Sequence, residues 1–89
     1  MSKRIVDYSV TDHGVEHCQY FQGDGVSFTE YTDCATGCGN SAWDAMEDAL
    51  EQLASMGWDV DNVPNNLSDE VSTVEDDFYH YVTIKVRFQ

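Results

Sequence analysis

The sequence predicts a small α+β domain: an antiparallel four-stranded sheet in the order β-β-β-α-β, with one amphipathic helix packed on one face. The first third of the chain has short alternating runs separated by glycine-containing turns. The middle has one apolar stripe at helical spacing, and the end has a long alternating run. A chain of 89 residues is long enough for one domain, residues 1–89, with a modest core.

Alternation and turn chemistry predict the first three strands. Asp12-His13-Gly14 and Gly23-Asp24-Gly25 are turn candidates, because Asp and Gly tolerate the left-handed conformations of tight turns. Between and around them lie three alternating runs, residues 4–11, 15–22 and 26–32. We therefore expect an antiparallel meander, followed by a loop over residues 33–40.

The helix is predicted between Ser41 and Gly57. Ser41 supplies an N-cap hydroxyl and Asp44 follows three residues later, which is close to a capping box. Gly57 is well suited to end the helix. The apolar stripe between them has spacings of three and four: Trp43, Met46, Leu50 and Leu53.

The last strand is predicted over residues 78–88. Residues 59–69 read as a loop because Pro64 blocks regular structure, and residues 70–77 fit either a short helix or an edge strand. The outer face of the last strand would carry Tyr79, Tyr81, Thr83, Lys85 and Arg87. The predicted core is Trp43, Met46, Leu50, Leu53, Val82, Ile84 and Val86.

Charge is the most informative feature for function. The net charge is −13, and all 17 acidic residues lie between Ile5 and Ile84, a stretch without lysine or arginine. Such self-repulsion opposes compaction, so it calls for an explanation other than folding. Anionic membrane surfaces and nucleic acid would both repel the chain. A basic nucleic-acid-binding protein would attract it.

We expect the carboxylates of the helix and of the segments after it to form the partner-binding surface. Neighbouring acids on a helix lie about 5–6 Å apart, and phosphates follow one another at about 3.4 Å along each DNA strand. The similar order of spacing favours a non-enzymatic inhibitor that mimics a nucleic-acid backbone in a basic groove. The candidate residues are Asp44, Glu47, Asp48, Glu51, Asp59, Asp61, Asp69, Glu70, Asp76 and Asp77. Plain solubility and adaptation to high salt remain open as alternative explanations.

The run from Ala35 to Leu50 (ATGCGNSAWDAMEDAL) resembles the strand-to-helix junction of HicB-like domains. That resemblance implies the same strand order and a regulatory or antitoxin-type domain that acts through protein contact. In composition the chain is similar to the short acidic DNA mimics and anti-CRISPR proteins of bacteriophages. The start of the chain lacks the apolar core of a signal peptide, so we expect it in the cytoplasm of a bacterial host.

Other chemistry has weaker signals. His13, His17, Cys34 and Cys38 have the residue types of a zinc site, although their spacings fit poorly. Cys38 precedes the helix N-terminus, where a thiolate is stabilised, and His17 or His80 would have to act as its base. We expect no cofactor and no enzymatic activity. Self-association through the last strand, read as an exposed edge, is a further hypothesis.

Overall fold

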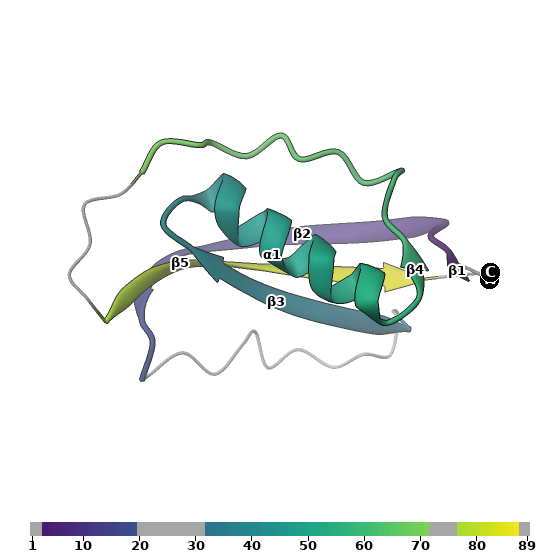
Figure 1. The fold of residues 1–89 in the computed structure, drawn as a ribbon, viewed down its shortest axis with the longest axis horizontal. Coiled ribbons are helices and arrows are strands. Elements are labelled where there is room, and N and C mark those ends of the chain that lie inside the picture. The colour runs from purple at the N-terminus through teal and green to yellow at the C-terminus, as the bar shows by residue number, and fades with distance from the viewer. Residues whose placement is uncertain (1–2, 20–31, 72–76, 88–89) are drawn as a thin grey trace.

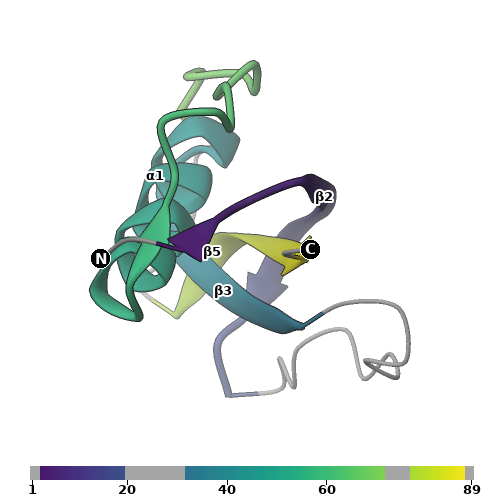
Figure 2. The same cartoon turned by 90° about the vertical axis from the view of Figure 1, so that its right-hand side faces the viewer.

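A computed structural model describes residues 3–19, 32–71 and 77–87 (Figure 1). Along the chain it has β1 (Lys3–Arg4), β2 (Asp7–His17), β3 (Asp33–Gly39), α1 (Ala42–Ser55), β4 (Trp58–Asp59) and β5 (Phe78–Arg87). The helix crosses one face of the sheet formed by the longer strands (Figures 1 and 2). No helix in the described part has the length and apolarity needed to span a membrane.

The α+β class is confirmed, but the predicted four-stranded antiparallel sheet is not. The described residues form a three-stranded antiparallel sheet in the order β2-β5-β3 and a separate parallel pair, β1 with β4. The predicted strand over residues 4–11 is interrupted at Ile5 and Val6. The chain before this break pairs with the segment that follows the helix, where Lys3 N donates to Gly57 O at 2.7 Å.

The predicted hairpin turn at Asp12-His13-Gly14 is wrong, because β2 continues through it as one strand of 11 residues. The pairing with β5 shifts register between Asp12 and Gly14, which is the mark of a β-bulge. Gly14 has a φ of 76° and its N–H donates to the Asp12 carboxylate at 2.9 Å. Residues 20–31, with the second predicted turn and most of the third predicted strand, lie outside the described residues.

The predicted loop over residues 33–40 is also wrong, since Asp33–Gly39 forms β3. Its glycines permit close contact between helix and sheet instead of a turn. A Cβ on Gly37 would lie 2.1 Å from Ala45 O, and one on Gly39 would lie 2.6 Å from Asp44 Cβ. Small residues on β3 therefore let the helix backbone almost touch the strand.

The helix prediction is confirmed from cap to stop. Ser41 Oγ accepts a hydrogen bond from Asp44 N at 3.1 Å, and Gly57 adopts a φ of 98° just after the last turn. Met46 and Leu53 are buried, as predicted, but Trp43 is 38% exposed. Alanines take the positions closest to the sheet because the space there is too small for an indole: Ala42, Ala45 and Ala49.

The final strand is confirmed over Phe78–Arg87, but it does not lie at an edge, which is the condition for self-association through it. β5 lies between β2 and β3, so both of its edges are hydrogen-bonded, and side chains on both of its faces are buried in its central part. Val82, Ile84 and Val86 are fully buried. Three residues that were expected to face solvent are buried as well: Tyr81, Thr83 and Lys85. β5 therefore has no free edge for pairing with a second copy. Ile5, Trp58 and Val63 complete the core beside the helix.

Candidate acidic interaction surface

The helix carries its acidic residues in one row. Asp44, Glu47, Asp48 and Glu51 follow at spacings of three and four, so they share one side of α1. Asp44, Glu47 and Glu51 are exposed. We call these three residues the helix acids.

Asp48 differs from the helix acids because it turns toward β3. Its Oδ2 accepts from Cys38 N at 3.0 Å and from Gln52 Nε2 at 3.3 Å, and Gln52 Nε2 also donates to Thr36 O at 2.8 Å. These bonds tie the helix to the strand. Asp48 is half-buried, so its carboxylate is less accessible to a partner than the carboxylates of the three helix acids.

Two loop acids lie close to the start of this row. The segment after β4 runs back along the helix toward its N-terminal end (Figure 1). There Trp43 N donates to Ser68 O at 2.8 Å, and Asn65 Nδ2 donates to Trp43 O at 3.1 Å. Asp69 and Glu70 follow Ser68 directly and are exposed. The loop therefore extends the acidic row beyond Asp44.

The remaining candidates are more dispersed. Asp59 is half-buried at the other end of the helix, where its Oδ1 accepts from Asp61 N at 3.1 Å. Asp77 is exposed at the start of β5, with its Oδ2 4.0 Å from His17 Nε2. Asp76 lies outside the described residues. The ten predicted residues are therefore not one cluster: the helix acids share one side of α1, and Asp69 and Glu70 lie near the start of that helix.

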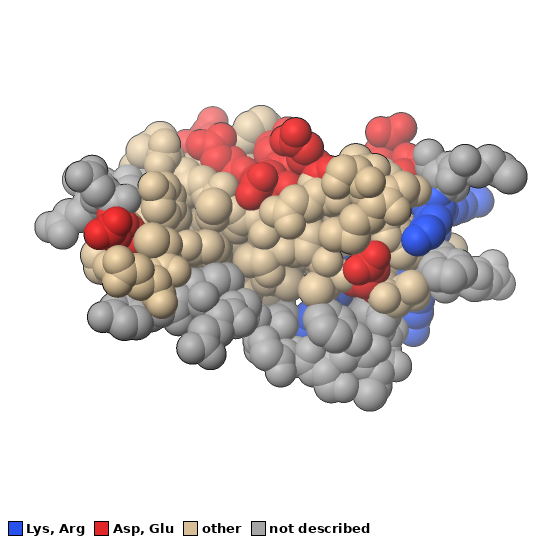
Figure 3. Space-filling view, turned by 60° about the horizontal axis from the view of Figure 1, so that its bottom comes forward, with Lys and Arg blue, Asp and Glu red and all other residues tan. Residues whose placement is uncertain are grey.

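Basic side chains leave this row unneutralised. Figure 3 shows acidic side chains gathered along the upper edge of the molecule, with the basic ones in its right half. Arg87 pairs with Asp7 at 2.7 Å, Lys3 lies over the ring of Trp58 at 5.3 Å, and Lys85 is buried. Within the described part of the chain, no lysine or arginine pairs with a helix acid.

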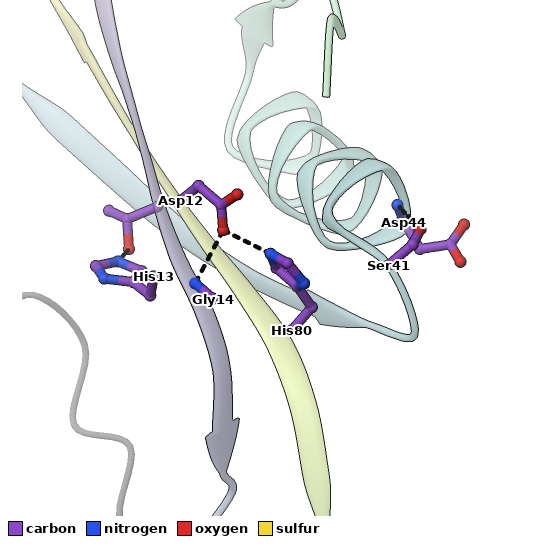
Figure 4. Close-up of polar contacts among 7 residues, drawn as sticks. Asp12, His13, Gly14, Ser41, Asp44 and His80 are labelled. Atoms are coloured by element: carbon purple, nitrogen blue, oxygen red, sulfur yellow. Dashed lines mark hydrogen bonds and ion pairs between the residues drawn. The ribbon is translucent and has the colours of Figure 1, made fainter. Parts of the chain in front are cut away.

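A second polar site links β2 with β5. His80 Nε2 donates to Asp12 Oδ1 at 2.5 Å, and the same oxygen accepts from Gly14 N (Figure 4). His80 Nδ1 is buried and has no hydrogen-bond partner within the described residues. Local sequence patterns do not predict this pair, because Asp12 and His80 lie 68 positions apart and meet beside the register shift of β2 against β5.

The structure does not assemble the hypothetical cysteine–histidine nucleophile. Cys38 pairs with Tyr81 across the β3–β5 ladder, so the two side chains share a face. Consecutive residues of a strand point to opposite faces, which places His80 on the other side of the sheet. His17 pairs with Phe78 and therefore shares the face of His80.

The Cys38 thiol is also poorly activated. Cys38 is exposed, but partial desolvation raises the pKa of its thiol, and the nearby Asp48 carboxylate and Cys18 raise it further. The expectation of a thiolate stabilised by the helix N-terminus is therefore wrong. Burial likewise raises the pKa of Tyr81 above its ordinary value, with Cys38, Cys18 and Tyr79 adding to the shift.

The hypothetical zinc ligands do not come together either. His13 Nε2 is hydrogen-bonded to Thr83 Oγ1 at 2.7 Å, and His17 Nδ1 accepts from Gln19 N at 3.2 Å. Among the residues with a described position, no three His, Cys, Asp or Glu side chains gather at one point. Cys18, Cys34 and Cys38 form no disulfide with one another.

Comparison of the chain with known protein families, curated proteins and solved structures finds no match. The resemblance to HicB-like domains thus stays a prediction from residues 35–50. What the chain does has to be argued from its own surface.

Proposed function

We propose that this protein is a non-enzymatic inhibitor that occupies the basic nucleic-acid-binding groove of a partner protein. The observation that carries the proposal is the row of exposed helix acids, extended by Asp69 and Glu70 and left without a basic partner in the described residues. An anti-CRISPR or related anti-defence role in a bacterial cytoplasm is its most concrete form.

The energetics of the helix support a binding role for the row. Each like-charge pair at these spacings costs on the order of 0.2–0.5 kcal/mol in helix stability. Only at Asp44 is part of this repulsion offset, because its carboxylate lies in the first turn and interacts favourably with the positive end of the helix dipole. A helix selected for stability alone would alternate acids with lysines. Lysines and arginines of a groove would supply the missing positive charge.

The test is a matched pair of charge reversals. Glu47→Lys changes a helix acid, and Glu16→Lys makes the same change in net charge at an exposed position of β2. The partner is first captured from bacterial lysate at low salt and identified by mass spectrometry. Competition with DNA is then measured on the purified partner.

We expect Glu47→Lys to weaken competition by about tenfold or more, and Glu16→Lys to change it little. We also expect wild-type binding to weaken steeply with added salt, because screening acts on exposed charges. Equal effects of the two reversals, or a partner that binds DNA and this protein together, would refute the proposal.

A HicB-like regulatory domain is the second candidate, and the exposed indole of Trp43 beside the helix acids favours it. Aromatic residues are enriched in protein interfaces, where apolar contact supplies affinity. Binding that persists in high salt and is lost in Trp43→Ala would support this candidate. A domain that unfolds in low-salt buffer would point to adaptation to high salt instead.

A further inference from the structure

Strand β2 is an edge of the described sheet. β5 lies on one side of it, and no described strand lies on the other. Two backbone hydrogen bonds show in which direction the carbonyl groups of β5 point. Arg87 O points toward the β2 side, where it accepts from Val6 N, and Val86 O points toward the β3 side, where it accepts from Thr32 N. Odd-numbered residues of β5 thus direct their backbone groups toward β2, and even-numbered residues direct theirs toward β3.

The register then identifies the backbone groups at the outer edge of β2. Ser9 and Thr11 are paired with odd-numbered β5 residues and so direct their N–H and C=O groups toward β5. Tyr8 and Val10 alternate with them and direct theirs away from the sheet. Beyond the bulge, Cys18 N donates to Asp77 O, so the same alternation makes Val15 face outward.

The residues with outward backbone groups also carry apolar side chains. Tyr8 and Val15 are 38% and 40% exposed, and Val10 is half-buried at the margin of the core. Val6 lies just before the strand and directs its N–H toward β5, but its side chain is 51% exposed and adds to the apolar surface. They are uncovered because α1 packs on β3 and β5 and leaves β2 to one side (Figure 2). An apolar stripe therefore lies beside a row of available hydrogen-bonding groups.

We propose that the edge of β2 from Asp7 to Thr11 accepts a strand from a basic partner, which extends the sheet by backbone pairing. Such a strand would place apolar side chains beside Tyr8 and Val10. Its alternate side chains would lie on the opposite face, beside Asp7. The bulge at Asp12 and Gly14 ends the regular edge and limits the added strand to this half of β2.

Charge selects this occupant over a second copy of the chain. β2 contains neither lysine nor arginine, so self-pairing would bring together two chains of net charge −13. A strand rich in lysine or arginine would be attracted instead, with Asp7, which Arg87 already contacts at 2.7 Å, as the one carboxylate of this half of β2. The basic character of the partner rests on the proposed function, but the surface is separate from the helix acids.

The probe is a capped octapeptide that alternates lysine with valine. Amide hydrogen exchange, followed by NMR in the full chain, should show new protection at Tyr8 and Val10 when the peptide is added. The same peptide methylated on every backbone nitrogen keeps its charge but cannot donate, so we expect it to bind about tenfold or more weakly. A glutamate–valine peptide controls for charge and should give no protection.

One pair of variants tests the edge itself. Val10→Pro removes an outward N–H without removing a donor to β5, and Val10→Thr retains that N–H. We expect Val10→Pro to weaken peptide binding about tenfold and Val10→Thr to leave it within about twofold. The methylated peptide keeps the test decisive if Val10→Pro does not fold.

Protection elsewhere, or equal binding of the methylated peptide, would overturn the proposal. Protection of Tyr8 and Val10 without peptide, together with the mass of a dimer, would assign the edge to a second copy and also overturn it. Glu47→Lys separates this inference from the proposed function. In this variant the peptide should still protect the amides of Tyr8 and Val10, whereas the partner with the nucleic-acid-binding groove should no longer bind. If Glu47→Lys retains that partner and the peptide still protects β2, the proposed function fails and the edge site stands.

Discussion

The two strands that flank β5 differ in what covers them. β3 presents Ala35, Gly37 and Gly39, and the helix lies so close to it that a Cβ at either glycine would collide with α1. β2 presents Tyr8 and Val15, and these side chains remain partly exposed. Small side chains on β3 thus determine that the helix packs over β3 and β5 and not over β2. The strand at the other edge of the sheet, β2, keeps apolar side chains that no described element covers.

The largest effect is expected where the helix touches β3. In Gly37→Ala, the new methyl would meet Ala45 O at 2.1 Å and Ala49 N at 2.4 Å, and helix backbone cannot move aside as a flexible side chain can. We expect a loss of about 3 kcal/mol or more in the free energy of unfolding, measured by urea denaturation.

Gly14→Ala is the matched control on β2. No atom lies within 4 Å of its new methyl, so only the φ of 76° is unfavourable, at about 1–2 kcal/mol. If Gly14→Ala costs as much as Gly37→Ala, close packing on β3 is not what holds the helix in place.

A middle-sized effect is expected at the start of the helix. Ser41 is 1% exposed and its Oγ accepts from Asp44 N, so Ser41→Ala removes a buried cap. We expect a loss of about 1 kcal/mol in the free energy of unfolding. Ser55→Ala, at the exposed last turn, should cost less than about 0.5 kcal/mol. Equal losses would show that the cap contributes nothing specific.

The smallest effect concerns the thiol on β3. Because the pKa of Cys38 is raised, its thiol stays protonated and unreactive at pH values where an ordinary cysteine begins to ionise. Alkylation of Cys38 by iodoacetamide, followed by mass spectrometry across pH, should therefore rise at higher pH than in the urea-unfolded chain.

Asp48→Asn should shift this rise to lower pH, because the removed carboxylate disfavours the thiolate. We expect alkylation about two- to threefold faster at a fixed pH on the rising part of the profile. Glu47→Gln removes the same charge from the outward side of the helix and is the control. If it accelerates the reaction as much as Asp48→Asn, the general charge of the protein raises the pKa instead of Asp48.

Periodic patterns and the helix stop at Gly57 predicted well, whereas the signals of Gly14 and Gly37 did not. The stripe from Met46 to Leu53 and the alternation of residues 78–87 specify α1 and β5, because buried faces repeat at fixed spacings. Glycine allows a turn, a bulge or close packing, and local sequence does not distinguish these uses. Gly14 therefore suggested a hairpin inside β2, and Gly37 suggested a loop inside β3.

The candidate site was predictable in part for the same reason. Helical spacing correctly put Asp44, Glu47 and Glu51 on one exposed side. It did not reveal that Asp48 bonds to β3, since that depends on how closely the strand approaches. The pairing of Asp12 with His80 depends on a register shift, which no local pattern encodes.

The near-contact of α1 with β3 has a consequence for selectivity. A helix held by backbone contact and by the side chains of Asp48 and Gln52 cannot tilt or slide to suit an approaching surface. The spacing between its carboxylates is therefore fixed. Stiffness reduces the entropy lost when the correct partner docks, and it penalises any target whose cations are wrongly spaced.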